Sequence, residues 1–204
     1  MNRQKLVFIF LLMLSAQPVI SQSPEKWINA GVSGNTSVDL LDRLDRDVLS
    51  QHPDWVVMMV GTNDMLNSSK MVDIKDYRYN LTELTKRMLS AGIEVILMSP
   101  PPVDTTYLFL RHSPGSFQVS PNAKIDTVKQ LMQATAKREG CGFFDLNQQF
   151  TINHLPQHNK DSLIRNENNS NTKDGVHLTS LGYRFVADGL YEYLAGEKIL
   201  LKGS

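Results

Sequence analysis

Apolar residues follow two alternating patterns along this chain, short continuous runs and longer stretches in which they recur every three or four positions. The short runs predict buried strands, and the helical spacing predicts amphipathic helices. The predicted strands are residues 27–30, 55–60, 93–98 and 142–146. The predicted helices are residues 38–49, 77–89, 125–136 and 180–200, with Gly92 where a helix C-terminal glycine is expected. This alternation predicts an α/β fold, a parallel sheet with helices on both faces.

Two segments lack either periodicity, residues 100–121 and 148–173. Both are rich in Pro, Ser, Asn and His, which is typical of loops. Loops of this length in a compact domain commonly carry function. We therefore expect both segments to form walls of a ligand cleft.

The N-terminus has the layout of a secretory signal peptide. Arg3 and Lys5 make the first residues positive, residues 6–14 are an unbroken apolar run, and Ser15 and Ala16 are small. The run is too short for a stable membrane span, which needs about 20 apolar residues. We expect residues 1–22 to be a signal peptide, residues 23–204 to be the domain, and the product to be secreted or periplasmic. The alternative is that residues 6–14 form a buried strand or helix of the domain itself.

Charge and cysteine content exclude several classes of protein. The 204 residues include 21 basic and 21 acidic residues, so the formal net charge is zero and a nucleic-acid partner is not expected. Cys141 is the single cysteine, so an internal disulfide is impossible, and no Cys/His cluster has zinc spacing. We expect Cys141 to be a small buried residue, and we expect neither a metal nor another cofactor.

Ligands of open parallel sheets bind outside the carboxyl ends of the strands, and polar motifs follow two of the predicted strands. Residues 29–37, Asn-Ala-Gly-Val-Ser-Gly-Asn-Thr-Ser, offer backbone amides that could face a developing oxyanion. The alternative there is ordinary helix capping by Asn35 or Thr36. Residues 61–64, Gly-Thr-Asn-Asp, place the Asn63 amide as a fixed donor after the next strand, although an Asx turn explains this motif equally well.

A third polar motif, residues 174–179, opens the last predicted helix with Asp-Gly-Val-His-Leu-Thr. Asp174 lies three residues before His177 and could hold the imidazole through Nδ1, which would leave Nε2 free as a general base. The alternative is a helix cap beside a surface histidine.

Together, the three motifs resemble the SGNH (GDSL-like) ester hydrolase family, whose four named positions are a Ser in Gly-Asp-Ser, a Gly, an Asn and a His. Gly34 and Asn63 match the Gly and Asn positions, and Asp174 and His177 match the terminal Asp-x-x-His. The resemblance covers roughly residues 27–194. It implies a three-layer α/β/α, flavodoxin-like sandwich with a mainly parallel sheet.

The family's first block is missing, because Gly-Asp-Ser occurs nowhere in the sequence. Removal of a signal peptide would leave almost nothing before Trp27, so the first strand of the sheet could be absent with the nucleophile. Three explanations compete: a truncated or misjoined gene product, a non-catalytic relative, or residues 6–14 as the first strand. In the third case Ser15 lies near the nucleophile's position, although Leu14 and Ala16 supply neither the glycine nor the aspartate of the family motif.

By resemblance, the reaction is hydrolysis of a small-molecule, lipid or carbohydrate ester without a cofactor. His177 would be the base, Asp174 would orient it, and Gly34 and Asn63 would hold the oxyanion. One alternative is a secreted binding protein that keeps the cleft but cannot form an acyl-enzyme. Another is a flavodoxin-like nucleotide binder, but residues 31–36 lack the Gly-x-Gly-x-x-Gly arrangement and the P-loop lysine.

Overall fold

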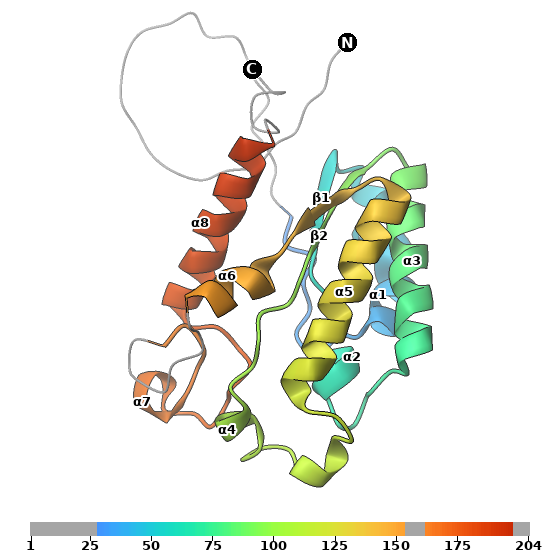
Figure 1. Cartoon of the computed structure of the whole chain (residues 1–204). Coiled ribbons are helices and arrows are strands. Elements are labelled where there is room, and N and C mark those ends of the chain that lie inside the picture. The colour runs from blue at the N-terminus through green and yellow to red at the C-terminus, as the bar shows by residue number, and fades with distance from the viewer. Residues whose placement is uncertain (1–27, 154–161, 198–204) are drawn as a thin grey trace, which may run out of the picture.

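A parallel sheet lies at the centre of the part of the chain that the computed structural model describes, residues 28–153 and 162–197 (Figure 1). Its three strands follow the order β1-β2-β3. They are β1 (Trp55–Met58), β2 (Glu94–Met98) and β3 (Gly142–Phe144). Val57 is paired with Ile96 in the first ladder, and Ile96 with Gly142 in the second. This arrangement confirms the predicted α/β class.

Helices cover both faces of this sheet (Figure 1). The longer ones are α1 (Ser37–Asp47), α3 (Ile74–Ser90), α5 (Pro121–Glu139) and α8 (Ser180–Gly196). The shorter ones are α2 (Thr62–Leu66), α4 (Thr105–Leu108), α6 (Leu146–Ile152) and α7 (Glu167–Ser170), with 3₁₀ turns η1 (Leu49–Gln51) and η2 (Pro114–Ser116). In Figure 1, α1, α3 and α5 lie on one side of the strands and α6 and α8 on the other.

Two hydrophobic clusters fill the space between the three layers. Side chains of β2 alternate between them, because successive residues of a strand point to opposite faces. Val95 and Leu97 belong to the cluster beneath α1, α3 and α5, whereas Ile96 and Met98 belong to the cluster beneath α6 and α8. The continuous apolar run of this strand therefore reflects burial on both faces.

The four predicted long helices are present with small changes at their ends, and Gly92 follows the end of α3 with a φ of +78°. Two predictions require correction. Residues 28–30 are not a strand, because no strand of the described structure lies beside them to complete a ladder. The two predicted long loops also contain short helices, α4 and η2 in the first and α7 in the second, and α6 takes up the start of the second loop.

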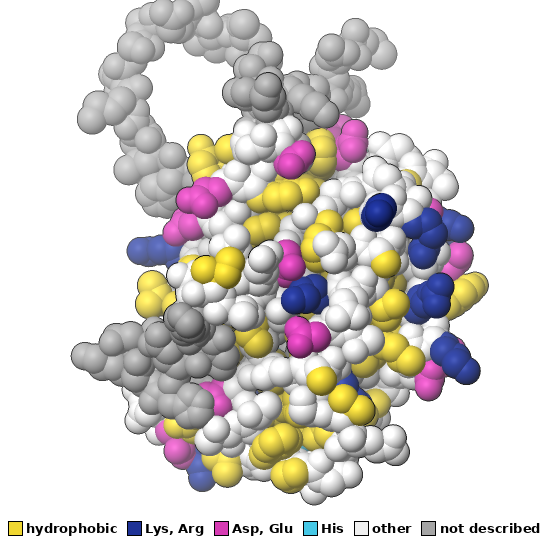
Figure 2. Space-filling view, viewed as in Figure 1, with side chains coloured by type: hydrophobic (Ala, Val, Ile, Leu, Met, Phe, Trp, Pro, Cys, Tyr) yellow, Lys and Arg dark blue, Asp and Glu magenta, His cyan; other side chains and the backbone are white. Residues whose placement is uncertain are grey.

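The predicted signal peptide and Ser15 lie outside the described residues. Within the described ranges, no helix is long and apolar enough to cross a membrane. On the face shown in Figure 2, basic side chains lie among acidic ones and do not merge into one large positive patch.

Strand β1 lies at one edge of the described sheet, and its apolar side chains are not fully covered. Val57 is 38% exposed, and Met59, just beyond the strand, is 44% exposed. Both alternate with Met58, which is buried in the cluster under α1 and α3. Helix α8 packs over the opposite end of the sheet, where Tyr193 and Phe144 have ring centroids 5.4 Å apart. In the described part of the chain, Trp55 of β1 packs against the cluster under α6 and α8, whereas Val57 and Met59 remain partly exposed.

Candidate active site

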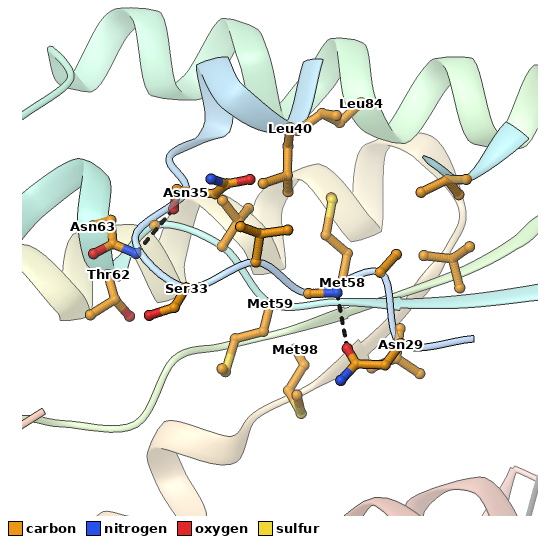
Figure 3. Close-up of a pocket in the computed structure, with 18 of the residues that line it drawn as sticks. Asn29, Ser33, Asn35, Leu40, Met58, Met59, Thr62, Asn63, Leu84 and Met98 are labelled. Atoms are coloured by element: carbon orange, nitrogen blue, oxygen red, sulfur yellow. Dashed lines mark hydrogen bonds between the residues drawn. The ribbon is translucent and has the colours of Figure 1, made fainter. Parts of the chain in front are cut away.

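A groove with a volume of about 880 Å³ follows the exposed edge of β1. Its walls include residues 28–35 on one side and residues 54–63 on the other. Figure 3 shows the segment from Asn29 to Asn35 running alongside β1, with Met59 and Met98 pointing to the same side. Gly34, Asn63 and His177 all line this groove. The fold therefore brings three of the predicted site residues to one cavity.

His177 is held by Asp174, as the spacing of the two residues predicted. Nδ1 of His177 lies 2.9 Å from Oδ2 and 3.0 Å from Oδ1 of Asp174. The Asp174 side chain is only 10% exposed, whereas that of His177 is 46% exposed. With Nδ1 held by the carboxylate, Nε2 is the ring nitrogen that can exchange a proton with a ligand.

The Asp174 carboxylate is stabilised in its charged form. Burial raises its pKa, but hydrogen bonds from the side chain and backbone of His177 and from the backbone of Val176 outweigh burial, so the pKa lies well below the ordinary value of 3.8. Both backbone N–H groups donate to Oδ1 at 2.9 Å. Asp174 therefore stays ionised and presents a fixed negative charge to the imidazole.

Arg111 is a site residue that the sequence did not single out. Its Nη1 lies 3.3 Å from Oδ1 of Asp174 and 3.4 Å from the Asp174 carbonyl oxygen. Arg111 belongs to residues 100–121, which were predicted to form a cleft wall, and it lines the groove. Only the prediction of the loop pointed to it, because nothing in the local sequence pairs Arg111 with a carboxylate 63 residues later.

Gly175 allows the chain to turn between Asp174 and His177. Its φ is +78°, and a Cβ atom there would lie 2.5 Å from the carbonyl oxygen of Asp104 and 2.7 Å from the backbone nitrogen of Leu108. The backbone N–H of Asp104 donates to the Gly175 carbonyl oxygen across this contact at 2.8 Å. Glycine therefore lets the Asp-x-x-His turn pack directly against the start of α4.

Gly34 lies in a tight turn that faces the groove. The N–H of Asn35 donates to the carbonyl of Val32 at 3.3 Å, and Gly34 has a φ of +80°. Asn63 fixes this turn, because its Nδ2 donates to the carbonyl oxygen of Asn35 at 3.0 Å (Figure 3). The two motifs that the sequence separates by almost thirty residues are therefore directly bonded.

Asp64 anchors the start of α1 and was not assigned a role from sequence. The backbone N–H of Ser37 donates to both oxygens of Asp64, at 2.9 and 3.1 Å, and the Ser37 hydroxyl donates to Oδ1. Asn80 from α3 donates to the same hydroxyl at 3.0 Å. Burial raises the pKa of Asp64, although the hydrogen bonds from Ser37 oppose this shift. This buried network joins α1, α2 and α3 behind the Gly34 turn.

The two segments predicted as cleft walls behave differently. Pro101, Val103, Leu108, Arg111 and His112 from the first segment line the groove. None of the described residues in 148–153 and 162–173 does so, and the prediction for the second segment is wrong for those residues. Residues around Ile164 instead make an antiparallel bridge to Leu178. That bridge supports the turn that carries His177.

Two other expectations concern metals and Cys141. Across residues 28–153 and 162–197, no group of three or more His, Cys, Asp or Glu side chains is placed to hold a metal ion. Cys141 is half-buried, and burial raises its thiol pKa. A raised thiol pKa disfavours the nucleophilic thiolate.

The fold and groove define a class of protein, a parallel α/β domain with an acid-paired histidine beside the carboxyl ends of its strands. The chain belongs to the GDSL-like Lipase/Acylhydrolase family, whose family model matches residues 14–185. The predicted resemblance to SGNH (GDSL-like) hydrolases is thereby confirmed.

Known relatives agree with this membership. An acetylxylan esterase of Geobacillus stearothermophilus is 36% identical over 80 residues, which are 36% of each chain. That match therefore spans about a third of the esterase. The uncharacterized lipoprotein YqeF of Bacillus subtilis is 24% identical over 176 residues, 81% of this chain and 72% of that protein. The crystal structure of the acetyl xylan esterase AlAXEase is similar with a TM-score of 0.65 and 24% identity, over 80% of this chain and 78% of that one.

Another similar fold is that of Axe2, an acetylxylan esterase from Geobacillus stearothermophilus. It matches with a TM-score of 0.58 and 23% identity, over 78% of this chain and 68% of Axe2. Solved catalytic mutants of Axe2 replace a serine, an aspartate or a histidine by alanine. The replaced aspartate and histidine of Axe2 are three positions apart.

Proposed function

We propose that this protein hydrolyses carboxylic esters through a serine acyl-enzyme, with His177 as the general base. The observation that carries the proposal is the His177–Asp174 pair, held at 2.9 Å with the imidazole half-exposed to a groove that Gly34 and Asn63 also line. An imidazole with one nitrogen fixed by a buried carboxylate is the arrangement that general-base catalysis requires. Membership of the GDSL-like family supports the same reaction class.

In the proposed reaction His177 Nε2 takes the proton of the attacking serine hydroxyl and then protonates the leaving alcohol. Asp174 keeps the ring in one tautomer and stabilises the imidazolium that forms in between. The Gly34 N–H and the second N–H of Asn63 Nδ2 donate to the oxyanion of the tetrahedral intermediate. The first N–H of Asn63 Nδ2 already donates to the carbonyl oxygen of Asn35. The Asn63 side chain would therefore both position the Gly34 turn and supply a donor to the oxyanion.

We assign no nucleophile among the serines of the described residues. Ser33 is the only serine of the described residues that lines the groove, and it lies in the loop that would have to clamp the oxyanion. Ser37 is buried and donates its hydroxyl hydrogen to Asp64. Neither serine is placed to attack a carbonyl held at Gly34, and Ser15, the candidate from the sequence, lies outside the described residues.

For the substrate we propose an acetyl ester of a carbohydrate. The relatives named above include acetylxylan esterases, and Axe2 shares the Asp and His spacing of this chain. The groove is long, open and largely apolar near β1, which suits a small acyl group better than it suits a charged one. Acetylated xylo-oligosaccharides are therefore the first natural esters to test, beside p-nitrophenyl acetate.

The matched variants His177→Asn and His52→Asn test this proposal. Both histidines line the groove, but His52 precedes β1 at its amino end. Asn also tolerates the left-handed backbone of His52, whose φ is 49°. We expect His177→Asn to lower kcat/KM for p-nitrophenyl acetate about 100-fold or more, the usual loss of a general base, and His52→Asn to change it less than about threefold.

Equal activity of the two variants would contradict the role of His177. A second outcome would also contradict the proposal: the full chain binds acetylated xylo-oligosaccharide without releasing acetate, and a fluorophosphonate probe does not label it. The protein would then be a binding protein that uses the same groove.

A further inference from the structure

We propose that Arg43 is a positioning residue of the groove, because its guanidinium ties both ends of the Gly34 segment, residues 30–35, to helix α1. Its effect on catalysis rests on the proposed ester hydrolysis, whereas its effect on the Gly34 segment does not. Three features of the described structure support the proposal: the irregular backbone of the segment, the contacts of Arg43, and the burial of its charge.

The Gly34 segment has no regular secondary structure to hold it. None of residues 30–35 belongs to a helix or a strand. Within the segment, the N–H of Asn35 donates to the carbonyl of Val32 at 3.3 Å, which is long for such a bond. Gly34 has a φ of +80°, and glycine enters this conformation as easily as it leaves it. The position of Gly34 therefore depends on side chains of the neighbouring elements.

Arg43 contacts both ends of the Gly34 segment. Its Nε donates to Oδ1 of Asn35 at 2.7 Å, and its Nη1 donates to the carbonyl oxygen of Ala30 at 2.7 Å. Both nitrogens belong to one rigid plane, so the two bonds together fix how far apart the ends of the segment lie. From α2, Asn63 holds the carbonyl oxygen of Asn35 at 3.0 Å (Figure 3). The segment is therefore held between α1 and α2.

The charge of Arg43 is buried and balanced. Its side chain is only 13% exposed, and its Nη1 lies 3.1 Å from Oδ2 of Asp47, one helical turn later in α1. A buried guanidinium keeps its charge and needs an acidic partner and further hydrogen bonds, which Asp47 and the segment provide. Leu44, the next residue, is buried in the core cluster beneath α1. Arg43 therefore holds the segment from a part of the helix that is itself fixed by packing.

The catalytic consequence follows from the geometry that an oxyanion donor needs. The Gly34 N–H is one of the proposed donors, and such a donor must lie about 2.7–3.1 Å from the oxygen that becomes charged. A displacement of about 1 Å in an active site can lower the rate about 100-fold. Without Arg43, the segment would lose two of its contacts with α1, and the Gly34 N–H would no longer be held at one position.

Backbone ¹⁵N relaxation of the full chain tests the positioning without any substrate. Arg46→Ala is the matched control for Arg43→Ala, because Arg46 also pairs with Asp47, at 2.6 Å, but its side chain is 75% exposed. We expect the order parameter of the Gly34 amide to fall from about 0.85 to below about 0.6 in Arg43→Ala and to stay at the parent value in Arg46→Ala. Order parameters of α5 should be alike in all three chains, which shows that each is folded. Equal values at Gly34 in the parent and Arg43→Ala would overturn the proposal.

A pair of esters reports on the oxyanion donors. The pair is p-nitrophenyl acetate and its thiono analogue, in which the carbonyl oxygen is replaced by sulfur, a larger atom and a weaker acceptor. Because the same folded molecules hydrolyse both, the ratio of the two kcat/KM values does not depend on how much of a sample is folded. We expect this ratio to fall about tenfold in Arg43→Ala, since misplaced donors lose their preference for oxygen, and to change less than about twofold in Arg46→Ala.

Arg43→Lys separates the geometry of the guanidinium from its charge. Lysine keeps a positive charge near Asp47 but offers one nitrogen in place of the planar fork that reaches Ala30 and Asn35 together. We therefore expect Arg43→Lys to resemble Arg43→Ala in both the ester ratio and the Gly34 order parameter. Parent values of both quantities in Arg43→Lys would show that charge alone suffices and would overturn the two-point contact.

The two measurements also separate this inference from the proposed function. A mobile Gly34 in Arg43→Ala with the ester ratio of the parent would overturn the catalytic role of the segment, while hydrolysis itself, and with it the proposed function, would stand. If the parent chain hydrolysed neither ester, the proposed function and the catalytic role would both be rejected. The order parameters would then still decide whether Arg43 positions the segment.

Discussion

The Asp174 carboxylate is the most strongly constrained charge in the site. It receives the backbone N–H groups of Val176 and His177, the imidazole of His177 and the guanidinium of Arg111. Hydrogen bonds to the charged form of a carboxyl lower its pKa, and here they outweigh the effect of burial. The same contacts that orient the imidazole therefore also keep its partner ionised.

Asp174→Asn tests this coupling of orientation and charge. Asparagine retains an oxygen for the backbone N–H groups but cannot stabilise the imidazolium, so we expect kcat to fall about 100-fold or more. Because the pKa of Asp174 is lowered in the folded state, its charge stabilises the fold at pH values above the ordinary 3.8, and this contribution is lost as the pH falls towards the lowered value. The difference in unfolding free energy between parent and variant should therefore shrink between pH 6 and pH 3 in urea titrations.

An exposed carboxyl provides the reference for that experiment. Asp42 lies on the solvent side of α1, and Asp42→Asn should give a difference from the parent that changes little over the same pH range. A difference for Asp174→Asn that grows on acidification would contradict the lowered pKa.

Gly175→Ala tests the contact between the Asp-x-x-His turn and α4. The new Cβ would meet backbone atoms of Asp104 and Leu108 at 2.5 and 2.7 Å, so the turn must move. Gly140→Ala is the matched control, because Gly140 has a similar φ of +73° and no atom within 4 Å of its Cβ position. We expect Gly140→Ala to lower the unfolding free energy by about 1–2 kcal/mol and Gly175→Ala by at least about 1 kcal/mol more. Chemical denaturation measures both, and equal losses would disprove the steric contact.

At the scale of elements, the start of α1 decides where the Gly34 turn lies. Thr36 and Asp39 form a capping box at this end of the helix, which the sequence shows as Thr-x-x-Asp. The longer-range link is the bond between Ser37 and Asp64, which ties α1 to α2. Together with the Asn63–Asn35 bond, it sets the distance between the two motifs that supply the proposed oxyanion donors.

Asp64→Ala should break this link. It would leave the buried N–H and hydroxyl of Ser37 without their acceptor, which we expect to cost about 2–4 kcal/mol of unfolding free energy. Asp64→Asn retains one acceptor oxygen and removes a charge that burial disfavours, so it should lose less. Asp42→Ala on the exposed side of α1 should stay within about 0.5 kcal/mol of the parent. Thermal or urea unfolding would contradict the link if Asp64→Ala behaved like Asp42→Ala.

For the whole molecule, the position of β1 at the edge of the described sheet predicts self-association. We expect the full chain to associate with itself as its concentration rises. A change at this edge, Met59→Lys, should reduce the association relative to the parent, because charge on an edge strand opposes strand pairing. Ile152→Lys, at a 61% exposed position on α6, is the control and should leave it unchanged. Sedimentation velocity measures the three chains.

If Met59→Lys and Ile152→Lys reduced association equally, net charge would be responsible and the edge of β1 would not. Both changes add one positive charge to a chain with no formal net charge, so the comparison separates position from charge.

The sequence alone determined most of the helices and strands, because the spacing of buried apolar residues along the chain depends on the local secondary structure. The apolar runs gave β1 and β2, helical spacing gave α1, α3, α5 and α8, and Asp174 and His177 could be paired because only three positions separate them. The sequence also revealed the family through short motifs around Gly34, Asn63 and His177.

Only the tertiary structure decided which distant groups meet. Arg111 contacts Asp174, 63 positions later in the sequence, and Ser37 contacts Asp64, 27 positions later. Neither the local sequence pattern nor the composition predicts which residues so far apart will meet. Residues 28–30 of the strand predicted at 27–30 do not form a strand for a related reason. A strand exists only beside a partner that completes its hydrogen bonds, and in the described structure these residues line a groove.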